Sequence, residues 1–344
     1  MENSQKVSIP LVSICVPTYN DGHFLALSLD SIVHQTYSNI EILVGDDASN
    51  DDTAEIVRSF DDPRIRYWRN EKNLGQFPNV NSLIQRARGC YVAVYHSDDQ
   101  YEPDIVKQEV TFLEAHPQIG AVFALDTRID AEGQILGITQ LPEEVQADTC
   151  LTLGDLIPPL LRHKNRILRG PTFMGRSELF QKVGWFSDDY DIAGDFEMWL
   201  RILTAYPIAV LGEHLMRYRR GATQVSTGYN RLRTFEEHYF TIMDQYLTNE
   251  GAADQINQHD LDEYAFHRLD DQTFRAANWI IRGDIDQAQI LLGQPYRWRT
   301  LLRGRQRRKL RVLTLRMLMK IGLALGANRP LTQLLIRTEY GGRL

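Results

Sequence analysis

Two adjacent acidic residues, Asp98 and Asp99, have the clearest capacity for chemistry in this sequence. They follow the apolar run 91–95, whose β-branched and aromatic residues predict a strand that is covered on both faces. Carboxylates that lie side by side repel each other unless a cation or a proton lies between them. A hard divalent cation that carries a phosphorylated substrate would explain the pair, and a solvated turn is the alternative.

The residues after the pair predict where it lies in the fold. Pro103 suits the first turn of a helix, and Asp104 favours the positive end of a helix dipole. The pair is therefore expected between the carboxyl end of a strand and the start of a helix. Open α/β sheets bind their ligands at this edge.

Strand and helix patterns alternate through the first part of the chain. Apolar runs predict strands, and helical spacing or capping residues predict a helix after each of the first three. Connections this short favour right-handed crossovers, which indicates a doubly wound parallel sheet over roughly the first 100 residues. The predicted strands are 12–17, 40–44, 65–68 and 91–95, and the predicted helices are 23–35, 53–60 and 78–88.

Known phosphate-binding loops are missing from this part of the sequence. No Gly-x-Gly-x-x-Gly follows the first strand, and no Gly-x-x-x-x-Gly-Lys-Ser/Thr occurs. The strand ends instead carry Tyr19, the pair Asp46 and Asp47, and the pair Asp98 and Asp99. This set offers an aromatic face, hydrogen-bond acceptors and a cation site, which a nucleotide with metal-neutralised phosphates could use together.

The composition is that of a soluble globular protein, 43% hydrophobic and 24% charged. The three cysteines form no Cys-x-x-Cys pair, so neither a zinc site nor a disulfide framework is expected, and Cys15 and Cys90 are predicted in the core. No signal peptide and no membrane-spanning run is found. The expected location is therefore the cytoplasm.

Five short segments occur in a recognisable order in the first part of the chain. They are Val16-Pro-Thr-Tyr-Asn20, Ser31-Ile-Val-His-Gln-Thr-Tyr37, Glu41-Ile-Leu-Val-Gly-Asp-Asp-Ala-Ser49 with Asp52-Thr53, Asn73-Leu-Gly75 and Ser97-Asp-Asp99. In this order they resemble the family 2 glycosyltransferases, which have the GT-A fold, and the resemblance covers roughly residues 10 to 225. It implies an α/β fold with a GT-A type doubly wound, mostly parallel sheet, followed here by a C-terminal helical region.

The resemblance implies a role for each residue of the donor site. Tyr19, beside Pro17, would stack on the nucleobase, and Asp47 would accept a hydrogen bond from it. Asp98 would contact the ribose. Asp99 would bind the divalent cation, Mn²⁺ or Mg²⁺, that bridges the diphosphate of the donor.

A second acidic motif supplies the implied catalytic base. The run Gly194-Asp-Phe-Glu-Met-Trp-Leu-Arg201 resembles the family's Asp-x-x-x-Trp-Leu-Arg, which places Asp195 at the base. Glu197 is two residues further on and fits a first-turn acid better than a catalytic group. Many family members have a histidine near position 220, where this chain has Arg220. That histidine's role cannot be transferred, although an arginine could contact a diphosphate directly.

The implied activity is the metal-dependent, inverting transfer of a sugar. The donor would be a nucleotide-sugar, with UDP as the expected nucleotide, and the acceptor a hydroxyl of a glycan or a lipid-linked molecule. A non-catalytic, glycosyltransferase-like binding or scaffold protein is the first alternative, but it would be expected to have lost Asp99 or Asp195. A sugar-1-phosphate nucleotidyltransferase is the second, but Pro17-Thr-Tyr-Asn-Asp-Gly22 is not the Gly-rich, Arg-containing loop that such enzymes need.

The C-terminal third divides into two further regions. Residues 1–228 form the predicted catalytic domain, and residues 229–295 a helical extension with one tetratricopeptide-like hairpin that turns at Gly283-Asp284. Residues 296–344 form a predicted basic, amphipathic tail with 13 Lys plus Arg against one Glu, a charge of +12 in a chain of net charge −7.

The tail indicates its own partner. Apolar residues from Leu310 to Leu325 are interrupted by Arg311, Arg316 and Lys320, which predicts an interfacial helix on anionic lipid. The enzyme would then be peripheral on the inner face of the membrane. Packing of the same leucines inside the protein is the alternative. Nucleic acid is not an expected partner, because no aromatic residues alternate with the arginines and no known nucleic-acid-binding module accompanies them.

Overall fold

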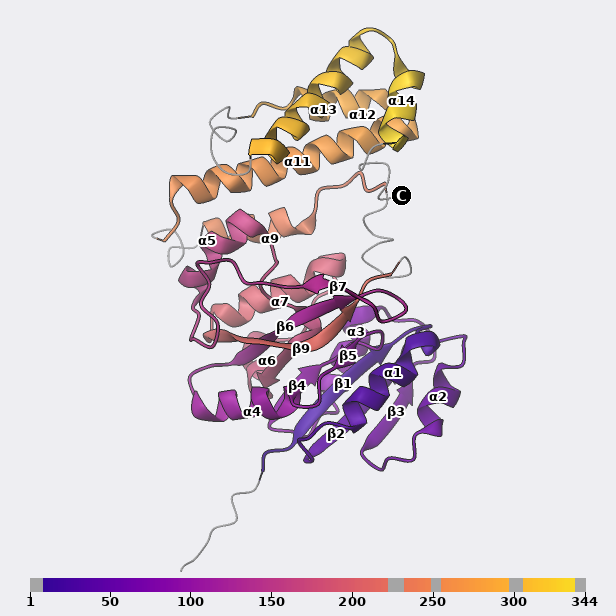
Figure 1. Cartoon of the computed structure of the whole chain (residues 1–344), viewed down its shortest axis with the longest axis vertical. Coiled ribbons are helices and arrows are strands. Elements are labelled where there is room, and N and C mark those ends of the chain that lie inside the picture. Colours follow the sequence, from indigo (N-terminus) through magenta and orange to yellow (C-terminus); the bar gives the residue numbers. More distant parts are fainter. Residues whose placement is uncertain (1–8, 222–231, 249–254, 297–305, 338–344) are drawn as a thin grey trace, which may run out of the picture. The chain divides into compact units, whose positions relative to one another are not determined.

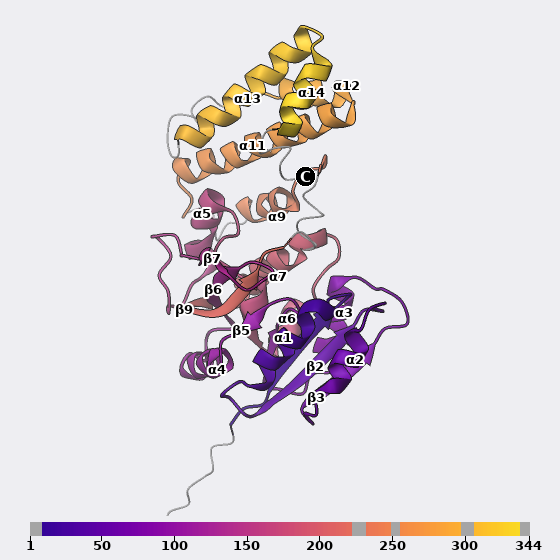
Figure 2. The ribbon, with the colours of Figure 1, turned by 45° about the vertical axis from the view of Figure 1, so that its right-hand side comes forward.

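The computed structural model describes residues 9–221, 232–248, 255–296 and 306–337 of the chain. It contains two compact units, drawn in Figures 1 and 2. The first comprises residues 1–153 and 165–220, and the second comprises residues 154–164 and 221–344. The predicted boundary at residue 228 lies outside the described residues.

The first unit is built on a nine-stranded sheet whose first four strands are parallel. Their order is β3-β2-β1-β4, as expected for a doubly wound start. β1 and β4 are almost entirely buried, which agrees with the absence of a polar face in their sequences. These strands are β1 (Val12–Thr18), β2 (Ile40–Asp46), β3 (Ile65–Arg69) and β4 (Tyr91–Val94).

The remaining strands make the sheet mixed. β8 runs antiparallel between β4 and β6, β6 pairs in parallel with β9, and β5 is antiparallel to β9 at the end of the order. Residues 130–133 lie in the turn that joins the antiparallel pair β6 and β7. These strands are β5 (Gln100–Tyr101), β6 (Ala121–Ile129), β7 (Ile135–Ile138), β8 (Phe173–Arg176) and β9 (Ile208–Arg219).

Helices cover both faces of this sheet. Along β6, Val122 and Ala124 belong to the core that includes α1, α2 and α4, whereas Phe123 between them packs on Trp199 of α7. This alternation follows from the period of two in a strand. The helices are α1 (Gly22–Val33), α2 (Thr53–Ser59), α3 (Gln76–Ile84), α4 (Ile105–Ala115), α6 (Leu179–Val183) and α7 (Gly194–Leu203).

One predicted helix start is wrong, for an identifiable reason. The helix expected from Pro103 begins at Ile105, because Gln100 and Tyr101 first pair with β9 as β5. In the second unit, α5 (Leu153–His163) runs without a break through Pro158 and Pro159, residues that usually interrupt a helix. Burial of its apolar residues outweighs the hydrogen bonds that the prolines cannot donate. These buried residues are Leu156, Ile157, Leu160 and Leu161.

The second unit is helical. A capping box at Asn257 starts α11, and Gly283 ends it with a φ of 86°, a left-handed conformation that glycine adopts without strain. The predicted hairpin turn at Gly283-Asp284 is therefore found between α11 and α12. The helices are α9 (His238–Leu247), α11 (Gln258–Arg282), α12 (Ile285–Gly293), α13 (Gln306–Ala324) and α14 (Asn328–Arg337).

The described part of the predicted tail shares its core with the predicted helical extension. Leu315 and Met319 of α13 and Leu331 and Leu335 of α14 pack with Ile280 of α11 and its neighbours. Two tail cations are buried as well. Arg316 donates to Thr273 Oγ1 and to the carbonyls of Leu291 and Leu292, and Lys309 pairs with Glu263. The expectation that the tail cations face solvent or lipid is wrong for these two.

Candidate active site

The predicted acidic pair lies in the loop between β4 and β5, at the carboxyl end of the parallel strands. Gln100 and Tyr101 pair with Arg217 and Met216 of β9, which fixes the far end of this loop. Asp99 is fully buried, and its Oδ1 accepts a hydrogen bond from the backbone N–H of Arg219 at 2.8 Å. The strand-end position predicted for the pair is therefore confirmed.

The side chain of Arg219 holds the same loop from β9. Its Nε donates to the carbonyl of Asp98 at 2.9 Å, and its Nη1 donates to the carbonyls of Asp130 and Ala131 at 3.0 and 2.9 Å. The guanidinium lies 4.4 Å from the ring centroid of Phe24. The sequence pattern singled out Arg220, and nothing in it distinguishes Arg219 from this neighbour.

The acidic loop offers a donor set that fits a divalent cation. Asp99 Oδ2 is buried without a hydrogen-bond partner, and it lies in a group with Asp98 and His96 whose ligand atoms are all within 4.8 Å of one another. Burial and the charge of Asp98 raise the pKa of Asp99 well above its usual range, and a cation would relieve both effects. Burial lowers the pKa of His96, which leaves its ring neutral and able to coordinate. The sequence pattern had not included His96.

The residues predicted to hold the donor lie at the ends of β1 and β2. The backbone N–H of Asp47 donates to the carbonyl of Thr18 at 2.9 Å, so Asp47 is adjacent to Pro17 and Tyr19. The Tyr19 side chain is 44% exposed at the strand end. The Asp47 carboxylate is buried and accepts from the backbone N–H groups of Leu74 and Gly75, both at 2.8 Å, and therefore anchors the segment Asn73-Leu-Gly75.

The predicted base, Asp195, is in the first turn of α7 and faces the segment before β8. A Cβ built on Gly170 would lie 3.0 Å from Asp195 Oδ2. Burial raises the pKa of Asp195 to about 6, opposed by the N–H of Phe196 and the charge of Arg169. A carboxylate with this pKa is suited to take a proton near neutral pH. Glu197 instead forms a bidentate pair with Arg201, with nitrogen–oxygen distances of 2.9 and 2.7 Å.

A match to a family model agrees with this arrangement. Residues 13–184, half of the chain, match the model of glycosyl transferase family 2. The chain belongs to glycosyltransferase family 2. This glycosyltransferase is 30% identical over 235 residues to an uncharacterised glycosyltransferase of Rickettsia prowazekii, an alignment that covers 68% of this chain and 71% of the relative. It is also 24% identical over 258 residues to the chondroitin synthase of Escherichia coli, covering 73% of this chain and 34% of that longer protein.

Solved structures confirm the GT-A type fold of this glycosyltransferase. Residues 1–349 of Staphylococcus aureus TarS, in complex with UDP-GlcNAc, superimpose with a TM-score of 0.53 at 19% identity, covering 83% of this chain and 93% of TarS 1–349. A mannosyltransferase from Pyrobaculum calidifontis, in complex with GDP-Man and Mn²⁺, superimposes with a TM-score of 0.56 at 18% identity, covering 97% and 85%.

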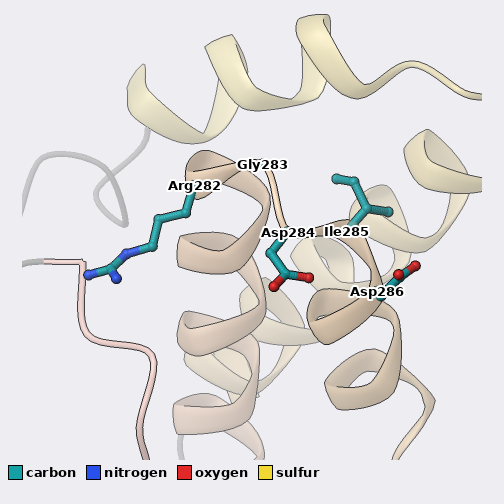
Figure 3. A pocket seen from close by; sticks show the side chains of 5 residues that line it. All are labelled: Arg282, Gly283, Asp284, Ile285 and Asp286. Carbon is teal, nitrogen blue, oxygen red and sulfur yellow. The ribbon is translucent and has the colours of Figure 1, made fainter.

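A shallow hollow in the second unit has no comparable chemistry. Figure 3 shows it at the turn between α11 and α12, where it is lined by residues 282–286. Asp284 caps α12 by accepting from the N–H of Gln287, and Arg282 donates to the carbonyl of Leu232. The polar groups therefore have structural roles at this turn.

Proposed function

We propose that this glycosyltransferase transfers a sugar from a nucleotide-sugar, with UDP as the expected nucleotide, to a hydroxyl of a glycan or lipid-linked acceptor. The transfer would invert the anomeric carbon and serve polysaccharide or glycoconjugate synthesis. The observation that carries the proposal is the unpartnered, buried Oδ2 of Asp99 in the loop with Asp98 and His96. A buried carboxylate oxygen needs a proton or a cation, and a diphosphate brings its own cation.

The ends of β1 and β2 would hold the nucleoside. Tyr19 offers a face for stacking and Pro17 shapes the strand end. Asp47 accepts from Asn70, Leu74 and Gly75 and keeps one acceptor position, on Oδ2, for the base N–H. Asp98, whose carboxylate lies beside the proposed cation site, would contact the ribose. The bound molecules of the two structural neighbours, UDP-GlcNAc in one and GDP-Man with Mn²⁺ in the other, support a nucleotide-sugar donor.

The cation would be held by Asp99, with Asp98 and His96 completing the protein's share of ligands. When bound, it supplies Lewis-acid stabilisation of the departing diphosphate. The imidazole nitrogen favours Mn²⁺ over Mg²⁺, which prefers oxygen ligands alone. The backbone N–H of Arg219 keeps Asp99 oriented throughout the reaction.

Asp195 would act as the general base. Its ionised carboxylate takes the proton from the acceptor hydroxyl while the hydroxyl oxygen bonds to the anomeric carbon. Gly170 leaves the space beside Asp195 Oδ2 that a side chain at position 170 would crowd. A single displacement with this base gives inversion.

A screen of nucleotide-sugars tests the proposal. The protein should be stabilised against heat by one nucleotide-sugar only when Mn²⁺ or Mg²⁺ is present, and should release the corresponding nucleoside diphosphate with an acceptor mixture. Stabilisation without any release of nucleoside diphosphate, across a broad range of glycan acceptors, would favour the non-catalytic alternative.

We also propose an anionic membrane surface as a partner of α13. Four apolar side chains of this helix, and Leu325 just after it, are exposed although the opposite side of the helix is packed, and the exposed cations Arg311 and Lys320 lie on the same helix. These apolar residues, here named the outer face, are Leu310, Met317, Leu318, Ile321 and Leu325. No helix among the described residues combines the length and the low polarity that crossing a bilayer demands. Surface adsorption would bring the enzyme to a lipid-linked acceptor.

A further inference from the structure

Arg169, just before the short helical turn 170–172, is fixed by two strands of the first unit. Its Nε donates to Oδ1 of Asp126 at 2.7 Å, and Asp126 is fully buried in β6. Its guanidinium lies 4.9 Å from the ring centroid of Tyr218 in β9. The ion pair with Asp126 and the stacking on Tyr218 together restrict both the position of the guanidinium and the orientation of its plane.

The same residue is adjacent to both halves of the proposed active site. Its neighbour Gly170 lies against Asp195, with only 3.0 Å between a Cβ built there and Asp195 Oδ2. Its stacking partner Tyr218 immediately precedes Arg219, whose N–H binds Asp99. In keeping with this placement, burial raises the pKa of both Asp195 and Asp99, and the charge of Arg169 opposes that rise in each.

The terminal nitrogens of Arg169 are still available to a ligand. Within the described residues only its Nε donates a hydrogen bond, and the side chain is partly exposed. A guanidinium that is fixed through Nε presents Nη1 and Nη2 as a fork, the geometry that matches two oxygens of one phosphate.

We propose that Arg169 binds the donor's diphosphate next to the bond that breaks. The inference rests on the proposed function, in which Asp195 is the base. In the reaction the bond from the anomeric carbon to the phosphate oxygen breaks, and that oxygen keeps the electron pair. The acceptor oxygen forms the new bond, and its proton goes to Asp195. Arg169 stabilises the charge that develops on the diphosphate.

Substitutions at Arg169 test this assignment by nucleotide binding. With Mn²⁺ present, Arg169→Gln should bind UDP or GDP roughly ten- to hundredfold more weakly, the effect of losing a hydrogen bond to a charged group, and UMP or GMP almost unchanged. Arg169→Lys should recover part of the loss. The matched control is Arg64→Gln, because Arg64 also pairs with an aspartate, Asp62, at 2.6 Å but lies at the start of β3.

The pH profile supplies a readout that a purely structural arginine would not move. Loss of the positive charge should raise the pKa of Asp195, so the acid limb of kcat should shift to higher pH in Arg169→Gln and less in Arg169→Lys. A folded Arg169→Gln protein with parental diphosphate affinity and an unshifted acid limb overturns the inference. So does a variant that changes only the KM of the acceptor, since Arg169 would then contact the acceptor instead.

Asp195→Asn, assayed in parallel, separates this inference from the proposed function. If the parent protein binds no nucleotide, the proposed function fails irrespective of Arg169, and if Asp195→Asn turns over normally, the assignment of Asp195 as the base fails. If Asp195→Asn is inactive and Arg169→Gln behaves as the parent, only the role of Arg169 is wrong.

Discussion

The backbone N–H of Arg219 donates to Oδ1 of Asp99 and leaves Oδ2 of the same carboxylate buried without a partner. Oδ1 is thus held by Arg219, which follows Asp99 by 120 residues in the sequence, and Oδ2 is left for a ligand. The carboxylate is oriented before any ligand arrives, because the N–H belongs to the paired strand β9. Asp99 therefore combines a fixed geometry with an unsatisfied acceptor, as a cation ligand requires.

Asp99→Asn should abolish Mn²⁺ binding without unfolding the protein. The amide oxygen can still accept from Arg219, and a neutral group is cheaper to bury than a carboxylate. The melting temperature without metal should be equal to or above that of the parent. Electron paramagnetic resonance of free Mn²⁺, with and without UDP, measures the binding. If the variant retains parental Mn²⁺ affinity, Asp99 is not a ligand.

His96 should set the preference among cations. His96→Ala is expected to weaken Mn²⁺ binding at least about tenfold and to affect Mg²⁺ much less. His96→Asp should recover binding but bring the Mn²⁺ and Mg²⁺ affinities closer together, because the added ligand is then an oxygen. Competition titrations of the two cations measure this ratio, and equal ratios in the parent and His96→Asp would exclude His96 from the ligand set.

Asp195→Asn should slow sugar transfer by roughly a hundredfold or more and leave donor binding unchanged. In the parent, kcat should fall below about pH 6, because burial raises the pKa of Asp195 to about 6 and only the ionised carboxylate accepts a proton. Glu197→Gln is the matched control, since Glu197 lies in the same helical turn but pairs with Arg201. A collapse of turnover in Glu197→Gln alone, with normal donor binding, would move the base to Glu197.

Gly170→Ala should impair the base without removing it. The added methyl group would lie 3.0 Å from Asp195 Oδ2, closer than ordinary carbon–oxygen contact, so the carboxylate must shift by a few tenths of an ångström. A displacement of this size should lower kcat several-fold with little change in donor affinity. Gly293→Ala, where a Cβ would meet no atom within 4 Å, is the control. Unchanged kcat in Gly170→Ala would show that this contact does not position the base.

The sequence predicts the parallel half of the sheet and the strand-end position of Asp98 and Asp99, because both follow from local patterns. It does not predict β5, which depends on pairing with β9 more than 100 residues later. The roles of Arg219 and Arg169 also arise from distant contacts, with Asp99 in one case and Asp126 in the other. Cys90 is exposed although its apolar surroundings predicted a core position, since it lies at the rim just before β4.

The sequence likewise does not show which side of the tail helix α13 is buried and which side is exposed. Leu315 and Arg316 both belong to the predicted amphipathic pattern, yet both are buried by α11 and α12. Val312 and Met319 of the same run lie in buried clusters too. Periodicity indicates that a helix has an apolar stripe, but which stripe is covered depends on the tertiary partners.

Vesicle sedimentation should show binding of the full chain to anionic lipid through the outer face of α13. Each basic residue near such a surface contributes on the order of 1 kcal/mol, and the exposed apolar side chains add their burial. The double substitution Met317→Asp and Ile321→Asp should abolish binding but keep the fold, because both side chains are exposed, at 64% and 47%. Ile290→Asp on α12, at a site that is 56% exposed, is the matched control and should bind as the parent does.

The dependence of vesicle binding on lipid charge and salt distinguishes a specific role of the outer face from nonspecific adsorption. Binding to vesicles with anionic lipid should fall steeply as salt is raised, since the cationic contribution is screened, and binding to neutral vesicles should be weak at all salt concentrations. Parental binding by the double variant would show that the outer face of α13 is not the membrane contact. Failure of the full chain to bind anionic vesicles would leave α13 with only its structural role, the packing of Leu315 and Met319 in the helical core.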